Sequence, residues 1–369
     1  MAIICALRFD HYSGAMVGDE EYWLLRRRKS YYNDTIHKIL DDGTAEATGI
    51  AAAYGGWGHP AFHHEVVRAA NATLRALYAK GSEGWTETEG VARIAQLGHV
   101  ILSRYHHVIH RRVDETLRFL YGFTTDDLTR GYFEENGSRF DIAQDSVKSN
   151  ALKIVNYSDK RPANKTIFDN RGVLIGYDPT DGFGMFNFNG EKHVLCFVSG
   201  GFEAVGKGQY ASGQAFARFL NQKSVAQRRA GVDRVEGMVQ VIHATHMAED
   251  YYHEAGGNVS IVYIDGRGKS HDRRYHEIVD DRARLASELV RAFDWEQLTM
   301  ADTYELVDGL VFQSAPVEEI EHAMFERCRD AVSLELILRG YKHDWTRAPA
   351  VPAGPAPVTA PAKPARKKS

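Results

Sequence analysis

The start of the chain has two β-prone runs separated by turn residues. Residues 2–9 and 15–19 are mostly apolar, and residues 10–14 between them are polar, small or glycine. Such a pattern favours a β-hairpin, in which the chain reverses at the polar residues. A strand that begins at residue 2 would tie the amino end into a sheet, whereas most chain ends are loosely held. A third short β-prone run follows at 35–39.

Two long segments then carry apolar side chains three and four residues apart, which is typical of amphipathic helices. The first is expected from Pro60 to Leu77, and the second from about Glu89 to Leu120. Proline suits the first turn of a helix, because that position needs no backbone N–H donor. Glycines at 81 and 84 separate the two predicted helices.

The second half of the chain begins with a polar insertion at about 122–150, near a short helix expected from Asp145 to Val155. Short strands separated by turn residues follow, and then helices. The predicted strands are 173–178, 183–188, 194–198 and 259–264, and the predicted helices are 210–220, 232–252, 280–293 and 316–338. From residue 348 onward proline and alanine dominate, and this composition favours a disordered tail over 348–369.

The composition is typical of a globular protein, and the net charge limits the kinds of partner that we expect. The 369 residues are 44% hydrophobic and 25% charged, with a formal net charge of −4. This charge gives no reason to expect nucleic acid as a partner. No apolar run is long enough to span a bilayer, and the start lacks the features of a secretory signal, so we expect a cytoplasmic protein that does not bind membranes. Cys5, Cys196 and Cys328 have neither metal-binding nor CxxC spacing, which indicates buried thiols in a reducing compartment.

Six short motifs occur along the chain in an order that can be compared with known families. They are Ala6-Leu7-Arg8-Phe9, Val17-Gly18-Asp19, His37-Lys38-Ile39, Gly55-Gly56, Gly206-Lys207-Gly208 and Gly256-Gly257. In this order, the chain resembles proteasome β-type subunits and the related bacterial ATP-dependent protease subunit. The resemblance extends from Ala2 to about Gly266, interrupted by the insertion. It implies structural turns at the three glycine motifs, with Lys207 where the family has a serine.

The resemblance also implies a site at the start of the first strand. Family members begin with a nucleophilic threonine, whose hydroxyl needs its own free amine as base, a cation and a carboxylate that holds the cation. Asp19 and Lys38 match the carboxylate and the cation. The threonine falls on Ala2, which would head the chain after removal of the initiator methionine and has no side chain able to attack. Asp19 and Lys38 are therefore either remnants of a catalytic site or a buried structural ion pair.

One alternative nucleophile and one metal-binding pattern remain. If four residues were trimmed, Cys5 would head the chain, and cysteine is a competent nucleophile. His243, His246 and Glu249 lie on the helix predicted to end at about residue 252, with His253 just beyond, a pattern that can bind a metal. Nothing in the sequence indicates an open coordination position, so we predict neither a metal nor a cofactor.

The resemblance leads to a definite expectation of architecture. We expect an α+β fold, the four-layer α/β/β/α sandwich of N-terminal nucleophile hydrolases, over residues 1–266. A helical C-terminal extension would cover 267–347, followed by the disordered tail. Because family members assemble into rings, a homo-oligomer is implied.

Two functions stay open at this point. In the first, the chain is a bacterial proteasome-like subunit without catalytic activity, which serves as a structural or binding member of an assembly and contacts a protein or peptide partner. In the second, it is an active peptidase or amidase that uses Cys5 as an atypical N-terminal nucleophile.

Overall fold

The structure is a computed structural model of the chain. It describes residues 3–19, 22–24, 28–30, 35–79, 93–158, 161–189, 194–252, 256–257 and 259–338. The predicted tail at 348–369 and the end of the predicted extension therefore lie outside the described residues. No helix in the described ranges combines the length and apolar character that crossing a membrane requires.

Two five-stranded sheets form the centre of the molecule, and every strand pair in them is antiparallel. The first sheet has the order β12 (Phe202–Gly206), β1 (Ile3–Arg8), β2 (Ser13–Asp19), β13 (Val259–Asp265) and β14 (Tyr275–Ile278). The second sheet has the order β11 (Val194–Phe197), β10 (Gly182–Asn189), β9 (Arg171–Asp178), β6 (Ala51–Trp57) and β5 (Ile36–Lys38). Two small hairpins, β3 (Tyr22–Leu24) with β4 (Arg28–Ser30) and β7 (Tyr132–Glu135) with β8 (Ser138–Asp141), lie outside these sheets.

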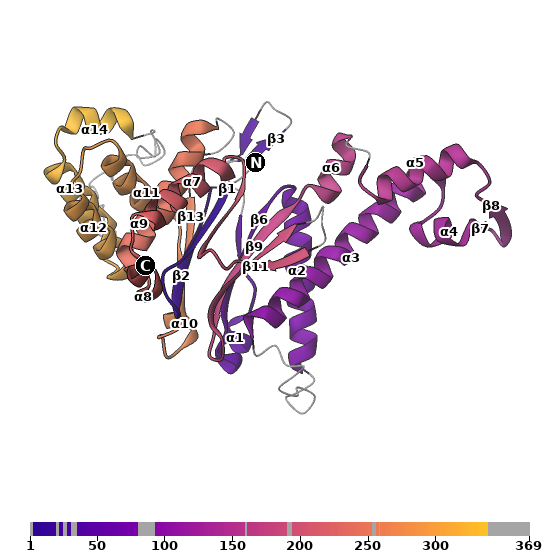
Figure 1. Ribbon diagram of the computed structural model, residues 1–369, viewed down its shortest axis with the longest axis horizontal. Coiled ribbons are helices and arrows are strands. Elements are labelled where there is room, and N and C mark those ends of the chain that lie inside the picture. The colour runs from indigo at the N-terminus through magenta and orange to yellow at the C-terminus, as the bar shows by residue number, and fades with distance from the viewer. Residues whose placement is uncertain are drawn as a thin grey trace, which may run out of the picture.

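Helices cover the outer face of each sheet (Figure 1). The first sheet is covered by α7 (Gln209–Asn221), α9 (Arg234–Tyr251) and α11 (Asp280–Asp294). Farther out lie α12 (Met300–Val307), the π-helix η2 (Asp308–Phe312), α13 (Val317–Arg327) and α14 (Ala331–Ile337). The second sheet is covered by α2 (Pro60–Ala79) and α3 (Ile94–Tyr121). The remaining helices are α1 (Asp42–Thr48), α4 (Thr125–Arg130), α5 (Asp145–Val155), α6 (Pro162–Phe168), α8 (Val225–Ala230) and α10 (His271–Arg274).

Strand β1 explains why the first residues form an unbroken apolar run. Successive side chains of a strand point to opposite faces. Ile4 and Ala6 belong to the apolar cluster between the two sheets, whereas Ile3, Cys5 and Leu7 belong to the cluster beneath the helices. Because both faces of β1 are buried from Ile3 to Leu7, these five positions are all apolar instead of alternating, and only the exposed Arg8 at the end of the strand is charged.

The predicted hairpin at the start of the chain is confirmed: Ile4 of β1 pairs with Gly18 of β2, and Arg8 pairs with Gly14. The helix expected from Asp145 to Val155 is present with those bounds as α5. It belongs to an arm, formed by the end of α3 with α4, β7, β8 and α5, that projects beyond the second sheet (Figure 1).

The expected turn at Gly55-Gly56 is wrong, because both glycines lie within strand β6. A Cβ atom on Gly55 would lie 2.7 Å from the Met16 sulfur and 2.8 Å from Cγ2 of Ile4. A Cβ atom on Gly56 would lie 2.4 Å from Cγ of His63. These glycines allow β6 to approach its neighbours closely, and they do not reverse the chain.

The other predicted turn glycines have backbone angles that suit turns. Gly206 and Gly208 have φ values of 125° and 88°, and Gly256 and Gly257 have φ values of 137° and 95°. Residues with side chains rarely adopt these angles. Gly206 is the last residue of β12, and Gly208 directly precedes α7.

The region after 266 differs from the expected helical extension in two ways. It contributes β14 to the first sheet, where Ile278 pairs with Ile261. The helix predicted over 316–338 is divided, because Cys328 has an extended backbone and Asp330 caps a new helix by accepting from the amides of Val332 and Ser333.

The expected boundary after residue 266 also does not coincide with a break in the core. Leu289, Leu306 and Met324 belong to the same apolar cluster as Ile3. The helices after 266 therefore complete the core on the outer face of the first sheet.

Substituting Gly56→Ala should destabilise the fold. The new methyl group would meet the ring of His63, which is buried and hydrogen-bonded to the Tyr54 hydroxyl and the Trp57 carbonyl. Overpacking of this kind costs about 1–3 kcal/mol, which urea unfolding measures. Gly213→Ala in α7 is the control, since a Cβ atom there would meet nothing within 4 Å. This variant should be as stable as the wild type or more stable, because alanine favours the interior of a helix over glycine by about 0.5–1 kcal/mol. Equal stability of the two variants would contradict the close packing at Gly56.

Candidate functional site

The region that the sequence singled out lies at the start of β1. Ile3, the first described residue, pairs with Gly206 at the end of β12. Its backbone amide donates to Oδ1 of Asp19, the last residue of β2, at 2.6 Å. The start of β1 therefore lies between a glycine loop and a carboxyl group.

Asp19 connects three segments of the chain. Its Oδ1 accepts from Ile3, and its Oδ2 accepts from the backbone amide of Gly256, beyond the end of α9, at 2.8 Å. The side chain is completely buried. Burial is the largest influence on its pKa and raises it well above the usual 3.8, although the two amide donors act in the opposite direction.

The expected ion pair between Asp19 and Lys38 is absent from the described residues. Lys38 forms its ion pair with Asp42 instead, and its Nζ lies 5.1 Å from the centroid of the Tyr275 ring. About a third of its side chain is exposed. The lysine therefore contacts α1 and β14 and does not contact the carboxyl group at the start of β1.

The pairing of β5 accounts for this displacement. Ile36 pairs with Gly55, and Lys38 pairs with Ala53. A Cβ atom on Gly18, next to Asp19, would meet Oγ1 of Thr35 at 2.5 Å and Cγ1 of Ile36 at 3.3 Å. Because a strand advances about 3.3 Å per residue, Lys38 lies roughly two to three residues too far along β5. The buried Thr35 hydroxyl has no hydrogen-bond partner in the described part of the chain.

Cys5 lies in the interior of β1 and is fully buried. Burial raises the pKa of its thiol to about 12, against the opposing effect of the Ser212 and Thr245 hydroxyls. A nucleophilic cysteine needs the reverse, a lowered pKa and access to solvent. To bring Cys5 to the amino end, the chain would also lose Ile3 and Ile4, which are fully buried.

A buried ion pair lies beside this region and was missed from the sequence. Arg291 of α11 donates to Oε2 of Glu249 on α9 at 2.6 Å, and both side chains are almost fully buried. The negative charge of Glu249 adds to the rise in the pKa of Asp19. Sequence reasoning considered Glu249 only as a metal ligand. The sequence feature that could have indicated the ion pair is Arg291, a charged residue between apolar residues of the helix predicted at 280–293.

The histidines of α9 are engaged with side chains of α11. Asp294 accepts from Nδ1 of His243 at 2.7 Å, and its other oxygen lies 3.1 Å from Nδ1 of His246. His246 Nε2 lies 2.8 Å from the Ser287 hydroxyl. His253 lies outside the described residues. Within those residues, no three His, Cys, Asp or Glu side chains are arranged to hold a metal ion.

The loop Gly206-Lys207-Gly208 allows the chain to pass close to α9. A Cβ atom on Gly208 would lie 2.5 Å from the Cβ of Ala248. Since Gly208 also has a positive φ, glycine meets both a conformational and a packing need here. The loop leads from the end of β12 directly into α7.

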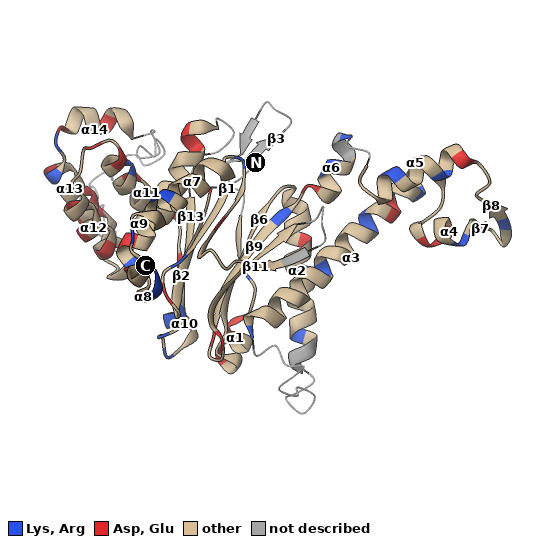
Figure 2. Cartoon of the chain, viewed as in Figure 1, with Lys and Arg blue, Asp and Glu red and all other residues tan. Residues whose placement is uncertain are grey.

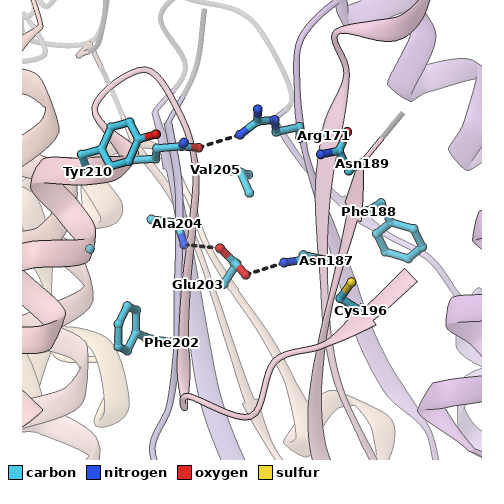
Figure 3. Close-up of a pocket in the computed structure, with 12 residues that line it drawn as sticks. Arg171, Asn187, Phe188, Asn189, Cys196, Phe202, Glu203, Ala204, Val205 and Tyr210 are labelled. Carbon is cyan, nitrogen blue, oxygen red and sulfur yellow. Dashed lines mark hydrogen bonds between the residues drawn. The ribbon is translucent and has the colours of Figure 1, made fainter. Parts of the chain in front are cut away.

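A cavity of about 420 Å³ lies along β12 and is also lined by Gln209 and Tyr210 at the start of α7 (Figure 3). Arg171 and Glu203 line it from opposite sheets. Arg171 donates to the side-chain oxygen of Gln209 at 3.0 Å, and Glu203 accepts from the Asn187 amide at 2.7 Å. Both charges are thus held by neutral amides, so the cavity offers one cationic and one anionic group to a small polar molecule.

The Asp19→Asn variant should have a changed dependence of stability on pH. Because the folded-state pKa of Asp19 is raised, the folded chain holds more protons than the unfolded chain between pH 3.8 and that pKa. Wild-type stability relative to the variant should therefore fall as pH rises through this window, by about 1.4 kcal/mol for each unit of separation.

Urea unfolding between pH 4 and 8 measures this difference. Asp126→Asn in the exposed first turn of α4 is the control and should have no comparable trend. A wild-type chain that gains stability relative to Asp19→Asn as pH rises would contradict a raised pKa.

Comparison with known proteins gives limited likenesses. No protein-family model and no curated protein matches the chain. Among solved structures, the chain is similar to Anbu (ancestral beta-subunit) from Yersinia bercovieri, with a TM-score of 0.49 and 10% identity. It is also similar to the Anbu (Gly-1) mutant from Hyphomicrobium sp. strain MC1, with a TM-score of 0.46 and 10% identity. Each comparison covers 76% of this chain and 88% of the other.

Proposed function

We propose that the chain is a proteasome-like subunit without an N-terminal nucleophile, which serves as a structural or binding member of a self-assembling complex. Its fold in this proposal is the four-layer α/β/β/α sandwich of N-terminal nucleophile hydrolases. The motifs from Ala6-Leu7-Arg8-Phe9 to Gly256-Gly257 support the family, and two sheets with helices on their outer faces are compatible with the architecture.

One observation carries the proposal of inactivity. Both oxygens of Asp19 accept backbone hydrogen bonds, while Lys38 pairs with Asp42. An N-terminal hydroxyl would need a cation beside it to become a good nucleophile. The sequence has Ala2 at the position that the resemblance assigns to the nucleophile. The carboxyl group therefore has a structural use that does not require chemistry.

The alternative, an active peptidase or amidase that uses Cys5, has weaker support. It requires a protease to remove two buried core residues and a thiolate to form where burial disfavours charge. Cys196 is the exposed thiol, but it lies in β11 and far along the chain from the amino end.

The assembly part of the proposal is supported by the projecting arm. Phe119 and Leu120, at the end of α3, are 88% and 46% exposed, and Phe140 and Leu152 of the arm are also exposed. Large apolar side chains on a projection are the kind of surface that a neighbouring subunit covers. A cytoplasmic location and a protein or peptide partner belong to the same proposal.

Mass spectrometry should test both parts of the proposal on one sample. Under native conditions we expect a mass that is a multiple of the 41.4 kDa chain. After treatment with a β-lactone and with an epoxyketone, the denatured chain should carry no adduct at its amino end. An adduct on residues 1–5 would contradict the loss of the nucleophile, and a single-chain mass at all concentrations would contradict self-assembly.

Iodoacetamide labelling supplies the matched control for the cysteine alternative. In the folded chain the exposed Cys196 should react, and the buried Cys5 should not. Hydrolysis of a peptide amide that disappears in Cys5→Ala but persists in Cys196→Ala would favour the alternative instead.

A further inference from the structure

A second cavity lies at the opposite end of β1 from Asp19. It has a volume of about 490 Å³ and is bordered by the turn after β1, the loop before β12, the end of α8 and the residue Arg267 after β13. Its size is within the usual range of small-molecule sites. Arg8 and Phe9 belong to the first motif of the sequence resemblance, but none of the candidate catalytic residues lines this cavity.

The cavity concentrates positive charge in a chain whose net charge is negative. Arg8, Arg228, Arg229 and Arg267 all line it, and Asp10 is its one acidic lining residue. The two arginines of α8 are among the residues coloured blue in Figure 2. Four arginines from three separate segments therefore face one space together with a single carboxylate.

Both carboxylate oxygens of Asp10 already accept hydrogen bonds from the protein. Its Oδ2 accepts from Arg267 at 2.6 Å, and its Oδ1 accepts from the backbone amides of Tyr12 and Ser13 at 2.7 and 2.9 Å. Arg8 only donates to the backbone carbonyl of Asp10 from its Nε, at 3.0 Å. Arg267 is thus paired with Asp10 and also, at 3.3 Å, with Asp265, whereas Asp10 forms no ion pair with another arginine of the cavity among the described residues.

Arg8, Arg228 and Arg229 form no ion pair with any residue in the described part of the chain. Like charges in a shared cavity repel one another, and the attraction of each arginine to a bound anion offsets this repulsion. Guanidinium groups match phosphate oxygens particularly well, because each can donate two parallel hydrogen bonds.

The loop before β12 adds backbone donors to the same cavity. Ser199, Gly200 and Gly201 line it, and a Cβ on either glycine would meet nothing within 4 Å. Gly201 has a φ of 80°, a conformation that favours glycine, whereas neither packing nor a positive φ requires glycine at position 200. The open space beside both glycines allows close approach to the main chain. The amides of Gly200 and Gly201 donate no hydrogen bond within the described ranges.

The remaining lining suits the organic part of a ligand. Tyr12 is 42% exposed, and the Arg267 guanidinium lies 4.9 Å from its ring centroid. Phe9, Leu220 and Val232 supply apolar surface. A cavity of this size, lined by the rings of Phe9 and Tyr12, exceeds what a single phosphate ion needs.

We propose that this cavity binds a small polyanion with a diphosphate group, through Arg8, Arg228, Arg229 and the Ser199-Gly200-Gly201 loop. The same diphosphate chemistry occurs in inorganic pyrophosphate and in a nucleoside diphosphate. Binding requires no catalytic step and does not depend on the proposed loss of the nucleophile.

Isothermal titration calorimetry of the full chain tests the proposal, with pyrophosphate, ADP and adenosine as probes. We expect both anions to bind and adenosine not to bind. The double variant Arg228→Gln/Arg229→Gln should weaken anion binding by about tenfold or more, since two charge-assisted contacts are lost. Rising salt should weaken wild-type binding because exposed charges are screened.

The matched control is Arg68→Gln/Arg130→Gln, which removes two exposed helical arginines that do not line this cavity and should leave anion binding unchanged. Arg8→Gln on β1 is a second, independent variant that should also weaken anion binding. Tighter binding of ADP than of pyrophosphate identifies a nucleotide site, and equal binding identifies a diphosphate site. Absence of anion binding at low salt, or equal binding by the wild type and the Arg228→Gln/Arg229→Gln variant, would overturn the proposal.

Discussion

The carboxyl group of Asp19 holds together the parts of the chain on which the candidate site depends. It receives one hydrogen bond from an amide 16 residues earlier and another from an amide 237 residues later. Both donors would be left unsatisfied without it, at a cost of about 1–3 kcal/mol for each buried group. The start of β1, the end of β2 and the turn after α9 are thereby fixed to one another, so this acidic residue has a structural task that needs no nucleophile beside it.

Close packing between the two sheets explains why Lys38 does not reach this carboxyl group. At Gly18 and Gly55 the sheets approach so closely that an added Cβ would lie within 3 Å of a neighbouring side chain. Thr35 and Ile36 occupy the space beside Gly18, while Lys38 lies farther along β5 at the surface. Burial is the largest influence on the pKa of Asp19 and raises it. The buried Arg291 of α11 is paired with Glu249.

Sequence patterns predicted the elements whose side chains carry a clear signal. The hairpin at the start and the helix at 145–155 were found because turn residues or apolar spacing marked them. Strand β6 was missed, since its alanines and glycines reflect closeness to another sheet and resemble a turn in isolation. The break between α13 and α14 was also missed, although Asp330 is a typical N-cap residue.

The parts of the candidate site that have a local sequence signal could be predicted, and those that depend on distant residues could not. A motif located Asp19, and the unbroken apolar run around Cys5 already indicated burial. The hydrogen bond from Gly256 joins residues too far apart in sequence for any local pattern to reveal. The displacement of Lys38 depends on how β5 pairs with β6, and short strands with few distinguishing residues specify their register weakly.

Hydrogen–deuterium exchange at single-residue resolution tests most directly whether Asp19 holds these segments. In the wild type the amides of Ile3 and Gly256 should both exchange slowly. In Asp19→Ala both should exchange rapidly, while the amides in the middle of β1 stay protected by their pairing with β2 and β12. Rapid exchange of Ile3 and Gly256 in the wild type, or unchanged protection in the variant, would contradict the account.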